Sequence, residues 1–333
     1  MKNIIISSLF ISLLFLLLGC NTSNETKEEK PQAMNSHYPL NYDVFNYEGD
    51  VLQQTIKNEP ERVLVIGSAM AELMVKFGLQ DKVVGFGYDD QTNTSYQEEI
   101  KRMPLLSEMW PSKESIIALK PDLILSVASA FREDMIGSIP SWNERDIPTL
   151  TAVNFNVGRS KETYFDEIKN FGRVFNIEDQ TNEYINKQES RIQKIAGTID
   201  HSQEKPKVLF ISHVRNKYFY YSPDWCMVDE MIELANGEFV NMSDQPYIEL
   251  SAEAIIAENP DKIILTQFQK QNEEKTLHAL LGDKQLKNVN AIKNNDVLVV
   301  DYTNAVNGSP EIAKLYEDVA KFIQPTQFSG AEL

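Results

Sequence analysis

Short apolar runs and segments of helical periodicity alternate along the chain. The first unit consists of an apolar run at Val63–Ile66, a helical pattern over 69–77 that ends at Gly78, and a second apolar run at Val83–Phe86. Runs that are apolar on both faces are typical of strands in a mostly parallel sheet covered by helices. The pattern therefore predicts an α/β lobe in the first half of the chain.

Further segments of both kinds continue this lobe and then begin a second one. In the first half we expect helices over 112–119, 135–145 and 161–175, and strands over 123–126 and 149–153. From Lys207 onward we expect a strand over 207–211, a hairpin edge at 218–221, a helix over 227–235, a strand over 297–300 and a last helix from Ser309 through 323. The fold class is thus α/β, with two lobes, each a mostly parallel sheet flanked by helices, and a ligand cleft between them.

A long polar segment separates the strands and helices of the first lobe from those of the second. Residues 180–199 are polar except at Tyr184, Ile185, Ile192, Ile195 and Ile199. A helix that is polar on most faces, and about 30 Å long, suits a connection between two bodies. About 295 residues follow the N-terminal region, which is more than one core usually absorbs. The expected divisions are a signal peptide over 1–20, a tether over 21–37, a first lobe over 38–178, a linker helix over 179–200 and a second lobe over 201–333.

An internal repeat supports the two-lobe interpretation. Segments 112–124 and 251–263 match at Ser, Glu, Ile, Ile, Ala, Pro, Asp and Ile with one spacing. In each copy the serine is predicted to cap a short helix, and the Pro-Asp pair to turn the chain into a buried strand. The repeat places Glu114 and Glu253 at the second position of each helix, where we expect them to be exposed. A carboxylate there also complements the helix dipole, so a purely structural role stays open.

The N-terminus has the composition of a targeting segment. Lys2 precedes an apolar core over 4–18 that is too short to span a bilayer stably. The core runs into Gly19 and Cys20, which resembles the lipobox of bacterial lipoproteins, whose cysteine is acylated and becomes the new N-terminus. Two or three acyl chains would hold a protein durably on a membrane. Residues 21–36 are polar and predict a disordered tether.

The net charge, cysteines and histidines of the chain argue against several kinds of partner and site. The net charge of −17 argues against nucleic acid and anionic lipid as partners. Cys226 is the only cysteine after Cys20, so no disulfide can form within the mature chain, and we expect Cys226 to be a small buried residue. The four histidines are scattered without the spacing of a metal site.

Motifs in both halves are shared with a known family. They are Pro60–Val65, Ala71–Leu73, Phe77–Leu79, Pro111–Glu114, Ala118–Leu123, Glu253, Pro260–Asp261 and Asn290–Val297. From about residue 38 to its end the chain resembles the bilobal substrate-binding proteins of siderophore, haem and cobalamin importers, in which one long helix joins the lobes. No single motif is specific to this family, but the motifs taken together are.

The resemblance implies a rigid protein that closes only slightly on its ligand and delivers it to an ABC importer. It also implies one glutamate per lobe that docks on arginines of the permease dimer, and these correspond to Glu114 and Glu253. Charged pairs of this kind mainly set orientation and encounter rate. The expectation is a monomeric, extracytoplasmic lipoprotein at the cell surface or in the periplasm, with no cofactor of its own.

The cleft should be lined by the segments that follow each strand, because ligands bind beyond the carboxyl ends of strands in open α/β sheets. Aromatic side chains are dense there, and two arginines accompany them. The candidate ligand-binding residues are Tyr88, Met109, Trp110, Arg132, His213, Arg215, Tyr220, Trp225, Tyr247 and Tyr302. Stacking and charge-assisted hydrogen bonds from such residues suit a bulky, flat or anionic complex. We expect the ligand to be an iron chelate, and a ferric siderophore is the leading candidate.

Haem and cobalamin are the alternative ligands. Met109 lies five residues before Glu114, where some haem-binding relatives have an axial methionine, and His213 or a tyrosine would supply the opposite ligand. Phe268 stands where such relatives have a histidine, which argues against haem.

Other classes of function find less support. The chain has no Gly-x-Ser-x-Gly elbow, phosphate loop, dinucleotide fingerprint or His-Glu-x-x-His motif. Gly67–Ala69, after the first strand, is the nearest match to a nucleophile turn, but it lacks the second glycine. We therefore expect no enzyme, with a surface-anchored hydrolase as the remote alternative. A lipoprotein that only senses or adheres is a third class.

Overall fold

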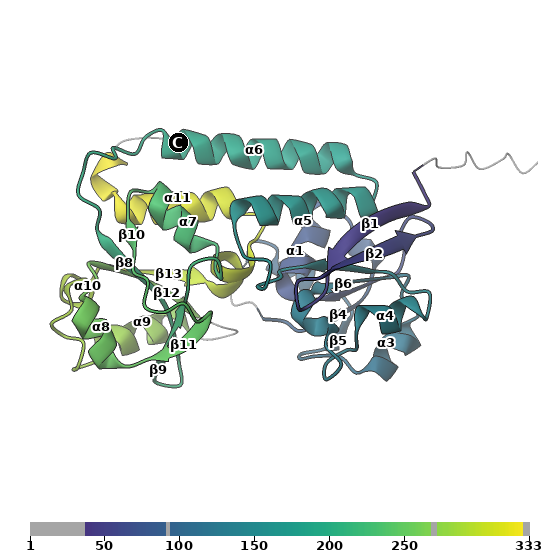
Figure 1. Ribbon diagram of the computed structural model, residues 1–333, viewed down its shortest axis with the longest axis horizontal. Coiled ribbons are helices and arrows are strands. Elements are labelled where there is room, and N and C mark those ends of the chain that lie inside the picture. The colour runs from purple at the N-terminus through teal and green to yellow at the C-terminus, as the bar shows by residue number, and fades with distance from the viewer. Residues whose placement is uncertain (1–36, 91–93, 268–271, 329–333) are drawn as a thin grey trace, which may run out of the picture. The chain divides into compact units, whose positions relative to one another are not determined.

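Two sheets and one long helix organise the described residues. The computed structural model describes residues 37–90, 94–267 and 272–328, which belong to one compact unit. Each sheet is flanked by helices, and helix α6 (Glu178–Ala196) runs along the same side of both lobes (Figure 1). The predicted α/β class with two lobes is confirmed.

The first lobe is built on a five-stranded, fully parallel sheet of order β5-β4-β3-β6-β7. Its strands are β3 (Val63–Ile66), β4 (Val83–Gly87), β5 (Leu105–Ser107), β6 (Leu123–Val127) and β7 (Thr149–Ala152). Its helices are α1 (Ser68–Lys76), α2 (Gln97–Ile100), α3 (Lys113–Leu119), α4 (Ile139–Asn143) and α5 (Lys161–Val174). Every residue of β3 and β6 is buried, as the apolar runs predict.

An antiparallel hairpin precedes this sheet, and no strand was predicted there. It consists of β1 (Leu40–Phe45) and β2 (Val51–Ile56). The Tyr42 hydroxyl donates a hydrogen bond to the Thr149 carbonyl at 2.9 Å, and the Thr151 hydroxyl donates to the Phe45 carbonyl at 2.9 Å. The hairpin is thereby attached to β7.

The second lobe contains a mixed sheet of order β11-β9-β8-β12-β13, with β10 also paired to β8. Its strands are β8 (Lys207–Val214), β9 (Lys217–Tyr221), β10 (Glu238–Phe239), β11 (Tyr247–Leu250), β12 (Lys262–Gln267) and β13 (Val297–Asp301). Its helices are α7 (Val228–Leu234), α8 (Ala252–Glu258), α9 (Glu273–Leu281), α10 (Asn290–Asn294) and α11 (Ile312–Ile323), with a π-helical turn η3 (Thr303–Asn307). The hairpin β8–β9 forms as predicted, but β9 is not an edge strand, because β11 pairs with its other side.

Helix α6 packs on α5 of the first lobe and on α11 of the second. Thr181, near its start, is fully buried against Gly172 of α5. Farther along, the Tyr184 hydroxyl donates to the Pro310 carbonyl at 3.1 Å, and Arg191 pairs with Glu317 of α11. The predicted connecting helix therefore exists and contacts both lobes.

Two predicted helices begin later than expected. The helix expected over 135–145 is confined to α4, because Gly137 has a φ of +98° and Pro140 is accepted only in the first turn of a helix. The last helix begins at Ile312 instead of Ser309. There the Ser309 hydroxyl accepts a hydrogen bond from the Glu311 amide at 3.1 Å, which keeps 309–311 in a turn before the helix.

Candidate functional site

An aromatic cavity lies between the two lobes. It has a volume of about 400 Å³ and is lined by Tyr88, Phe155, Val214, Tyr221, Trp225, Tyr247, Tyr302 and Val306. Tyr88 and Phe155 come from the first lobe, and the other six residues come from the second. Tyr88, Phe155 and Tyr302 follow the carboxyl ends of parallel strands, where open α/β sheets bind ligands. None of the eight lining side chains carries a full charge.

Ring pairs form the walls of this cavity. The rings of Tyr88 and Trp110 stack at 3.9 Å between centroids with 12° between their planes. Phe155 of the first lobe stacks on Trp225 of the second at 5.2 Å, also at 12°. The Tyr221 ring lies 4.9 Å from that of Tyr247. Because the packed rings hold each other in place, the cavity presents fixed aromatic surfaces to a ligand.

The backbone at Tyr88 directs this residue into the cavity. Tyr88 has a φ of 58°, a left-handed conformation that is uncommon outside glycine and occurs disproportionately at functional sites. Its amide donates to the Met109 carbonyl at 3.2 Å, which brings the segment before Trp110 next to the end of β4. Trp110, which is not a lining residue, therefore packs its ring against that of Tyr88.

A buried carboxyl group links the two lobes next to the cavity. Asp90 accepts hydrogen bonds from the Ser68 amide at 2.9 Å and from the Asn307 side-chain amide at 3.3 Å. Burial raises the pKa of Asp90 to about 6, although the hydrogen bonds from Ser68 oppose the shift. Burial also raises the pKa of Tyr88 and of Tyr302, so both phenols stay neutral at physiological pH.

Five of the predicted ligand-binding residues come together at the cavity. Tyr88, Trp225, Tyr247 and Tyr302 line it directly. Trp110 does not line it but stacks on Tyr88.

Three other candidates lie away from the cavity lining. Tyr220 is completely buried in the core of the second lobe, where its hydroxyl donates to Asn241 at 3.1 Å. His213 stacks on Tyr218 at 5.1 Å, and burial lowers the pKa of its imidazole. Met109 is exposed. The two candidates for haem ligation, Met109 and His213, are thus not among the residues that line the cavity.

The two predicted arginines also lie outside the lining. Arg132 donates to Asp134 at 2.7 Å, and its guanidinium lies 5.2 Å from the Tyr47 ring centroid. Arg215 is exposed in the turn between β8 and β9, where it and Asn216 have φ values of 51° and 61°. Two successive left-handed residues are typical of a type I′ hairpin turn. Neither predicted arginine is thus among the residues that line the cavity.

Two lining aromatics, Phe155 and Tyr221, were not predicted. Phe155 follows β7, so the rule about carboxyl ends of strands would have selected it. Tyr221 lies on β9, whose sequence KYFYY is aromatic on both faces and gives no indication of which face points to the cavity. The tertiary structure directs Tyr220 to the core and Tyr221 to the cavity.

The two copies of the internal repeat have the same local structure. The Ser112 hydroxyl accepts from the Ser115 amide at 3.2 Å, and the Ser251 hydroxyl accepts from the Ala254 amide at 3.2 Å. Each serine is the N-cap of its helix, α3 or α8, as predicted. Glu114 and Glu253 occupy the second position of these helices and are exposed.

The aspartates of the repeat attach each helix unit to its sheet. Asp122 accepts from the amides of Glu61 and Arg62, both at 2.9 Å, just before β3. Asp261 accepts from the Lys207 amide at 3.0 Å at the start of β8. The repeated aspartate therefore has the same structural role in both lobes.

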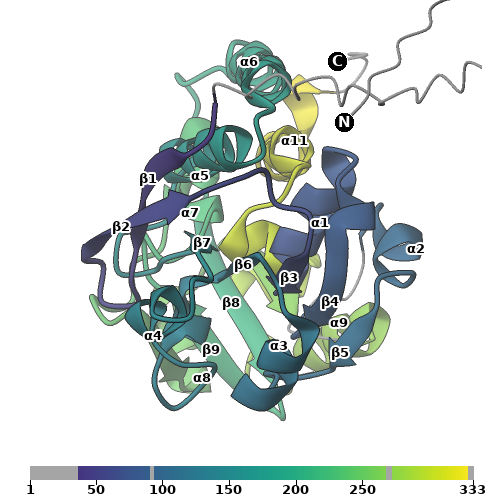
Figure 2. The same cartoon turned by 90° about the vertical axis from the view of Figure 1, so that its right-hand side faces the viewer.

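Both helices lie at the same side of the unit. In Figures 1 and 2, α3 and α8 lie toward the edge opposite α6, one in each lobe. The helices that carry the exposed Glu114 and Glu253 therefore lie at one side of the unit, in different lobes.

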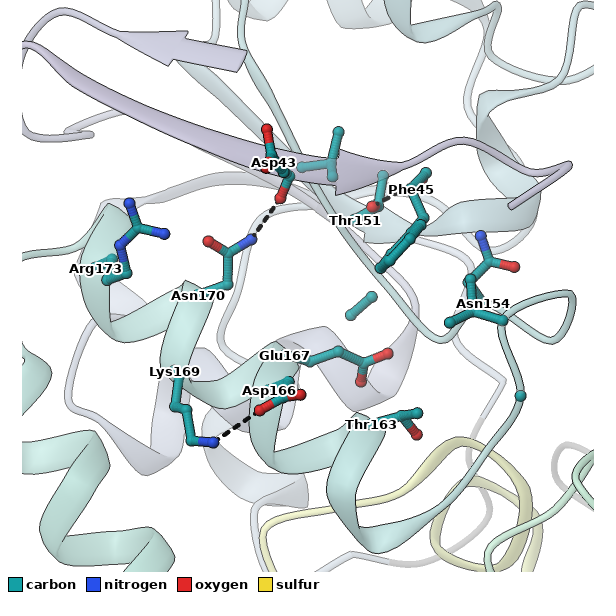
Figure 3. A pocket seen from close by; sticks show the side chains of 14 residues that line it. Asp43, Phe45, Thr151, Asn154, Thr163, Asp166, Glu167, Lys169, Asn170 and Arg173 are labelled. Carbon is teal, nitrogen blue, oxygen red and sulfur yellow. Dashed lines mark hydrogen bonds and ion pairs between the residues drawn. The ribbon is translucent and has the colours of Figure 1, made fainter. Parts of the chain in front are cut away.

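A second cavity of about 510 Å³ lies between β1, the end of β7 and α5 (Figure 3). Several of its polar groups are paired within the protein. The Asn170 side chain donates to the Asp43 carbonyl at 2.9 Å, and Lys169 pairs with Asp166 at 2.7 Å. Glu167 pairs with Arg159 at 2.6 Å, so the charged lining is largely satisfied without a ligand. The aromatic cavity is therefore the candidate site for a solute.

Some predictions lie outside the described residues or concern features that these residues lack. Cys20, the tether over 21–36 and Phe268 lie outside the described residues. Among the residues that the structure describes, no group of three His, Cys, Asp or Glu side chains is arranged to hold a metal ion. Within the same residues, no helix has the length and apolar composition that crossing a bilayer requires. Cys226 is a free, buried thiol, as expected.

Two α/β lobes joined by a long helix, with a cavity between them, define a bilobal solute-binding protein. The family model described as "Periplasmic binding protein" matches residues 63–302, and the chain belongs to this family. Members bind solutes for transport and are not enzymes, which confirms the prediction that this chain has no catalytic function.

Relatives in sequence agree with this assignment, and a solved structure shares the fold. The chain is 26% identical over 316 residues to the ABC transporter substrate-binding lipoprotein YvrC of Bacillus subtilis, covering 94% of each chain. It is 24% identical over 261 residues to a cobalamin-binding protein of Halobacterium salinarum, covering 76% of this chain and 66% of the relative. The crystal structure of an ABC-type Fe3+-hydroxamate transport system from Saccharomonospora viridis superposes with a TM-score of 0.71 at 19% identity, over 89% of this chain and 100% of the other.

Proposed function

We propose that this chain is an extracytoplasmic lipoprotein that binds a ferric siderophore and delivers it to the permease of an ABC importer. The predicted lipidation at Cys20 anchors it to the cell membrane, and it works as a monomer. The relative YvrC is named as an ABC transporter substrate-binding lipoprotein and is 26% identical to this chain along nearly the whole length of both. It therefore supports both the lipid anchor and the role in an ABC importer.

The observation that carries the ligand assignment is the lining of the aromatic cavity. Its eight side chains offer ring faces, hydroxyl groups and aliphatic surface but no full charge. A chelate with a large negative charge would have to leave water without a cation to meet it, at a high cost in free energy. With Asp90 buried nearby and a net charge of −17, the site favours a neutral or cationic complex. Among ferric siderophores, hydroxamates fit this requirement better than catecholates or citrate-type chelates.

Cobalamin is the second candidate ligand. A cobalamin-binding relative supports it, and an uncharged aromatic cavity suits its corrin ring. A cavity of about 400 Å³ encloses only part of so large a molecule, whereas it is of the right order for a compact ferric hydroxamate. Haem is less well supported, because Met109 and His213 do not line the cavity.

Delivery to the permease rests on Glu114 and Glu253. Both carboxylates are exposed, both lie on the second residue of a short capped helix, and both helices are at the side opposite α6. Two anionic points on separate lobes suit a permease with two equivalent cationic sites.

Tryptophan fluorescence of residues 21–333 tests the ligand assignment. This form retains all described residues and contains Trp110, Trp142 and Trp225. Titration with a ferric hydroxamate should quench the emission saturably at sub-micromolar concentration, because Trp225 lines the cavity and Trp110 supports it. A ferric catecholate and ferric citrate should not quench it at the same concentrations.

Two tryptophan variants locate the signal. Trp225→Phe keeps an aromatic ring in the cavity and should remove much of the quenching. Trp142→Phe changes a buried tryptophan of the first-lobe core and should leave the quenching intact. Saturable quenching by cobalamin alone would transfer the assignment to cobalamin, and quenching by haemin alone with a Soret shift would transfer it to haem. A response only to anionic chelates would contradict the argument from the uncharged lining.

A further inference from the structure

Each copy of the internal repeat exposes one isoleucine at the same position. Ile117 of α3 is 45% exposed, and Ile256 of α8 is 42% exposed. The preceding isoleucine of each copy, Ile116 or Ile255, is completely buried. The second isoleucine of the pair is therefore not needed for the core of either lobe.

The exposed isoleucines share a helix face with the glutamates. Positions three and four residues apart are neighbours on an α-helix. In α3 this places Glu114, Ile117 and Ala118 on one stripe, and all three are exposed. In α8 the equivalent stripe is Glu253, Ile256 and Ala257, again exposed throughout. We refer to these two stripes as the paired Glu-Ile-Ala patches.

A single exposed apolar residue on a protein surface is ordinary. The paired patches differ because the same acidic, apolar and small residues recur in both lobes and on the same side of the unit (Figures 1 and 2). Among the described residues, neither Glu114 nor Glu253 has an ion pair or side-chain hydrogen bond, and the neighbouring Lys113 pairs with Glu133 instead. Each patch thus offers an unpaired anion next to an exposed aliphatic side chain.

We infer that the paired Glu-Ile-Ala patches form a two-point contact surface in which Ile117 and Ile256 insert into two equivalent apolar sockets of the permease. This inference rests on the proposed function and identifies contacts that the glutamates alone do not supply. The carboxylates orient the complex from a distance, whereas the isoleucines add affinity by leaving water on contact. The small alanine beside each isoleucine lets the partner surface approach the helix closely.

Charge excludes two other occupants of this surface. A second copy of the chain would place carboxylates opposite carboxylates, since both patches are acidic. A bilayer with anionic lipids would repel the same groups. A partner with two related cationic and apolar sites satisfies both patches at once, as a two-fold symmetric permease does.

The test uses the full chain, purified as a lipoprotein in detergent, and importer complexes of the producing cell, each reconstituted in lipid nanodiscs. Binding is measured by biolayer interferometry for the wild type, Ile117→Asn, Ile256→Asn and the double variant. Each single change should weaken binding about tenfold, and the double change about a hundredfold, because the two sites are distant and independent. Val51→Asn is the control, because Val51 is 58% exposed on the hairpin strand β2, and it should bind like the wild type.

Solute binding separates this inference from the proposed function. The isoleucine variants should bind the solute with wild-type affinity, which also verifies that they are folded. If the double variant binds the importer within twofold of the wild type, the isoleucine contact is overturned, while Glu114→Gln with Glu253→Gln still tests the docking role of the carboxylates. If the wild type binds no importer complex, the proposed function itself fails and this inference fails with it.

Discussion

Helices α3 and α8 end at equivalent positions that have the same left-handed backbone conformation but carry different residues. Lys120 closes α3 with φ 50° and ψ 57°, and Asn259 closes α8 with φ 46° and ψ 59°. The left-handed region costs an ordinary L-residue about 1–2 kcal/mol, and asparagine tolerates it through local hydrogen bonds. The Asn259 side-chain oxygen accepts from the Asn290 amide at 2.9 Å, so this residue is fixed by a contact of its own.

This difference predicts opposite effects of glycine at the two helix ends. Lys120→Gly should raise the free energy of unfolding by about 0.5–1 kcal/mol, because glycine has no Cβ to oppose a positive φ. Asn259→Gly should give no gain or a loss, since it removes the hydrogen bond to Asn290. Urea denaturation followed by circular dichroism measures both. Equal stabilisation by the two substitutions would contradict the role given to Asn259.

The close packing of α5 on α6 depends on a glycine whose role the sequence does not reveal. Gly172 lies in the middle of α5, where glycine is unfavourable for a helix by itself. A Cβ at this position would lie 2.1 Å from the Thr181 hydroxyl oxygen on α6, far closer than van der Waals contact allows. The glycine thus allows the connecting helix to approach the first lobe closely.

Gly172→Ala should therefore lower the free energy of unfolding by about 1–3 kcal/mol, the usual cost of forcing extra volume into a packed contact. Gly197→Ala is the matched control at the other end of α6. Its Cβ would have a nearest neighbour at 3.3 Å, the Gln193 carbonyl oxygen, and the residue is exposed. It should change stability by less than about 0.5 kcal/mol. Thermal or urea unfolding compares them, and a stabilising Gly172→Ala would show that the helices are farther apart than described.

Between the lobes, the buried Asp90 makes the stability of the whole molecule depend on pH. Its pKa is about 6 in the folded protein and 3.8 in the unfolded chain. Between these values the folded protein keeps a proton that the unfolded chain has lost, so stability is greatest at the acidic end and falls as pH rises from about 4 to about 6. A shift of this size corresponds to at most about 3 kcal/mol. The nearby charge of Asp301 acts in the same direction.

Asp90→Asn isolates this contribution. The amide does not titrate and retains an oxygen that can accept from the Ser68 amide. The free energy of unfolding of the wild type, minus that of Asp90→Asn, should decrease as pH rises from about 4 to about 6 and then become constant. Asp229, whose pKa is also raised to about 6 by burial, is present in both proteins and cancels in the difference. Parallel pH profiles would mean that Asp90 is not buried as the structure has it.

Much of the fold was predictable because its signals are local. Fully apolar runs predicted β3 and β6, the repeat predicted the capped helices α3 and α8, and the polar stretch after 178 predicted α6. The hairpin β1–β2 was missed because Tyr42, Thr149, Thr151 and Phe45 meet only when β7 has formed. The late start of α4 and α11 depended on turns at Gly137 and Ser309 that compete with helix at the same residues.

The sequence by itself determined the buried strands β3 and β6, the connecting helix α6, which two segments repeat, and that aromatic side chains follow the strands of both lobes. Only the tertiary structure decided which of these aromatics face the cavity. Tyr220 and Tyr221 are adjacent and chemically identical, yet one is core and the other is lining, because alternate residues of a strand point to opposite faces and the fold chooses the face. The same holds for the two arginines. Arg132 and Arg215 come after strands, where cleft residues are expected. Arg132 is held outside the cavity lining by its hydrogen bond to Asp134 and its contact with the Tyr47 ring, and Arg215 by the geometry of the hairpin turn. Local pattern fixes the elements, whereas the direction of a side chain depends on contacts between residues far apart in the chain.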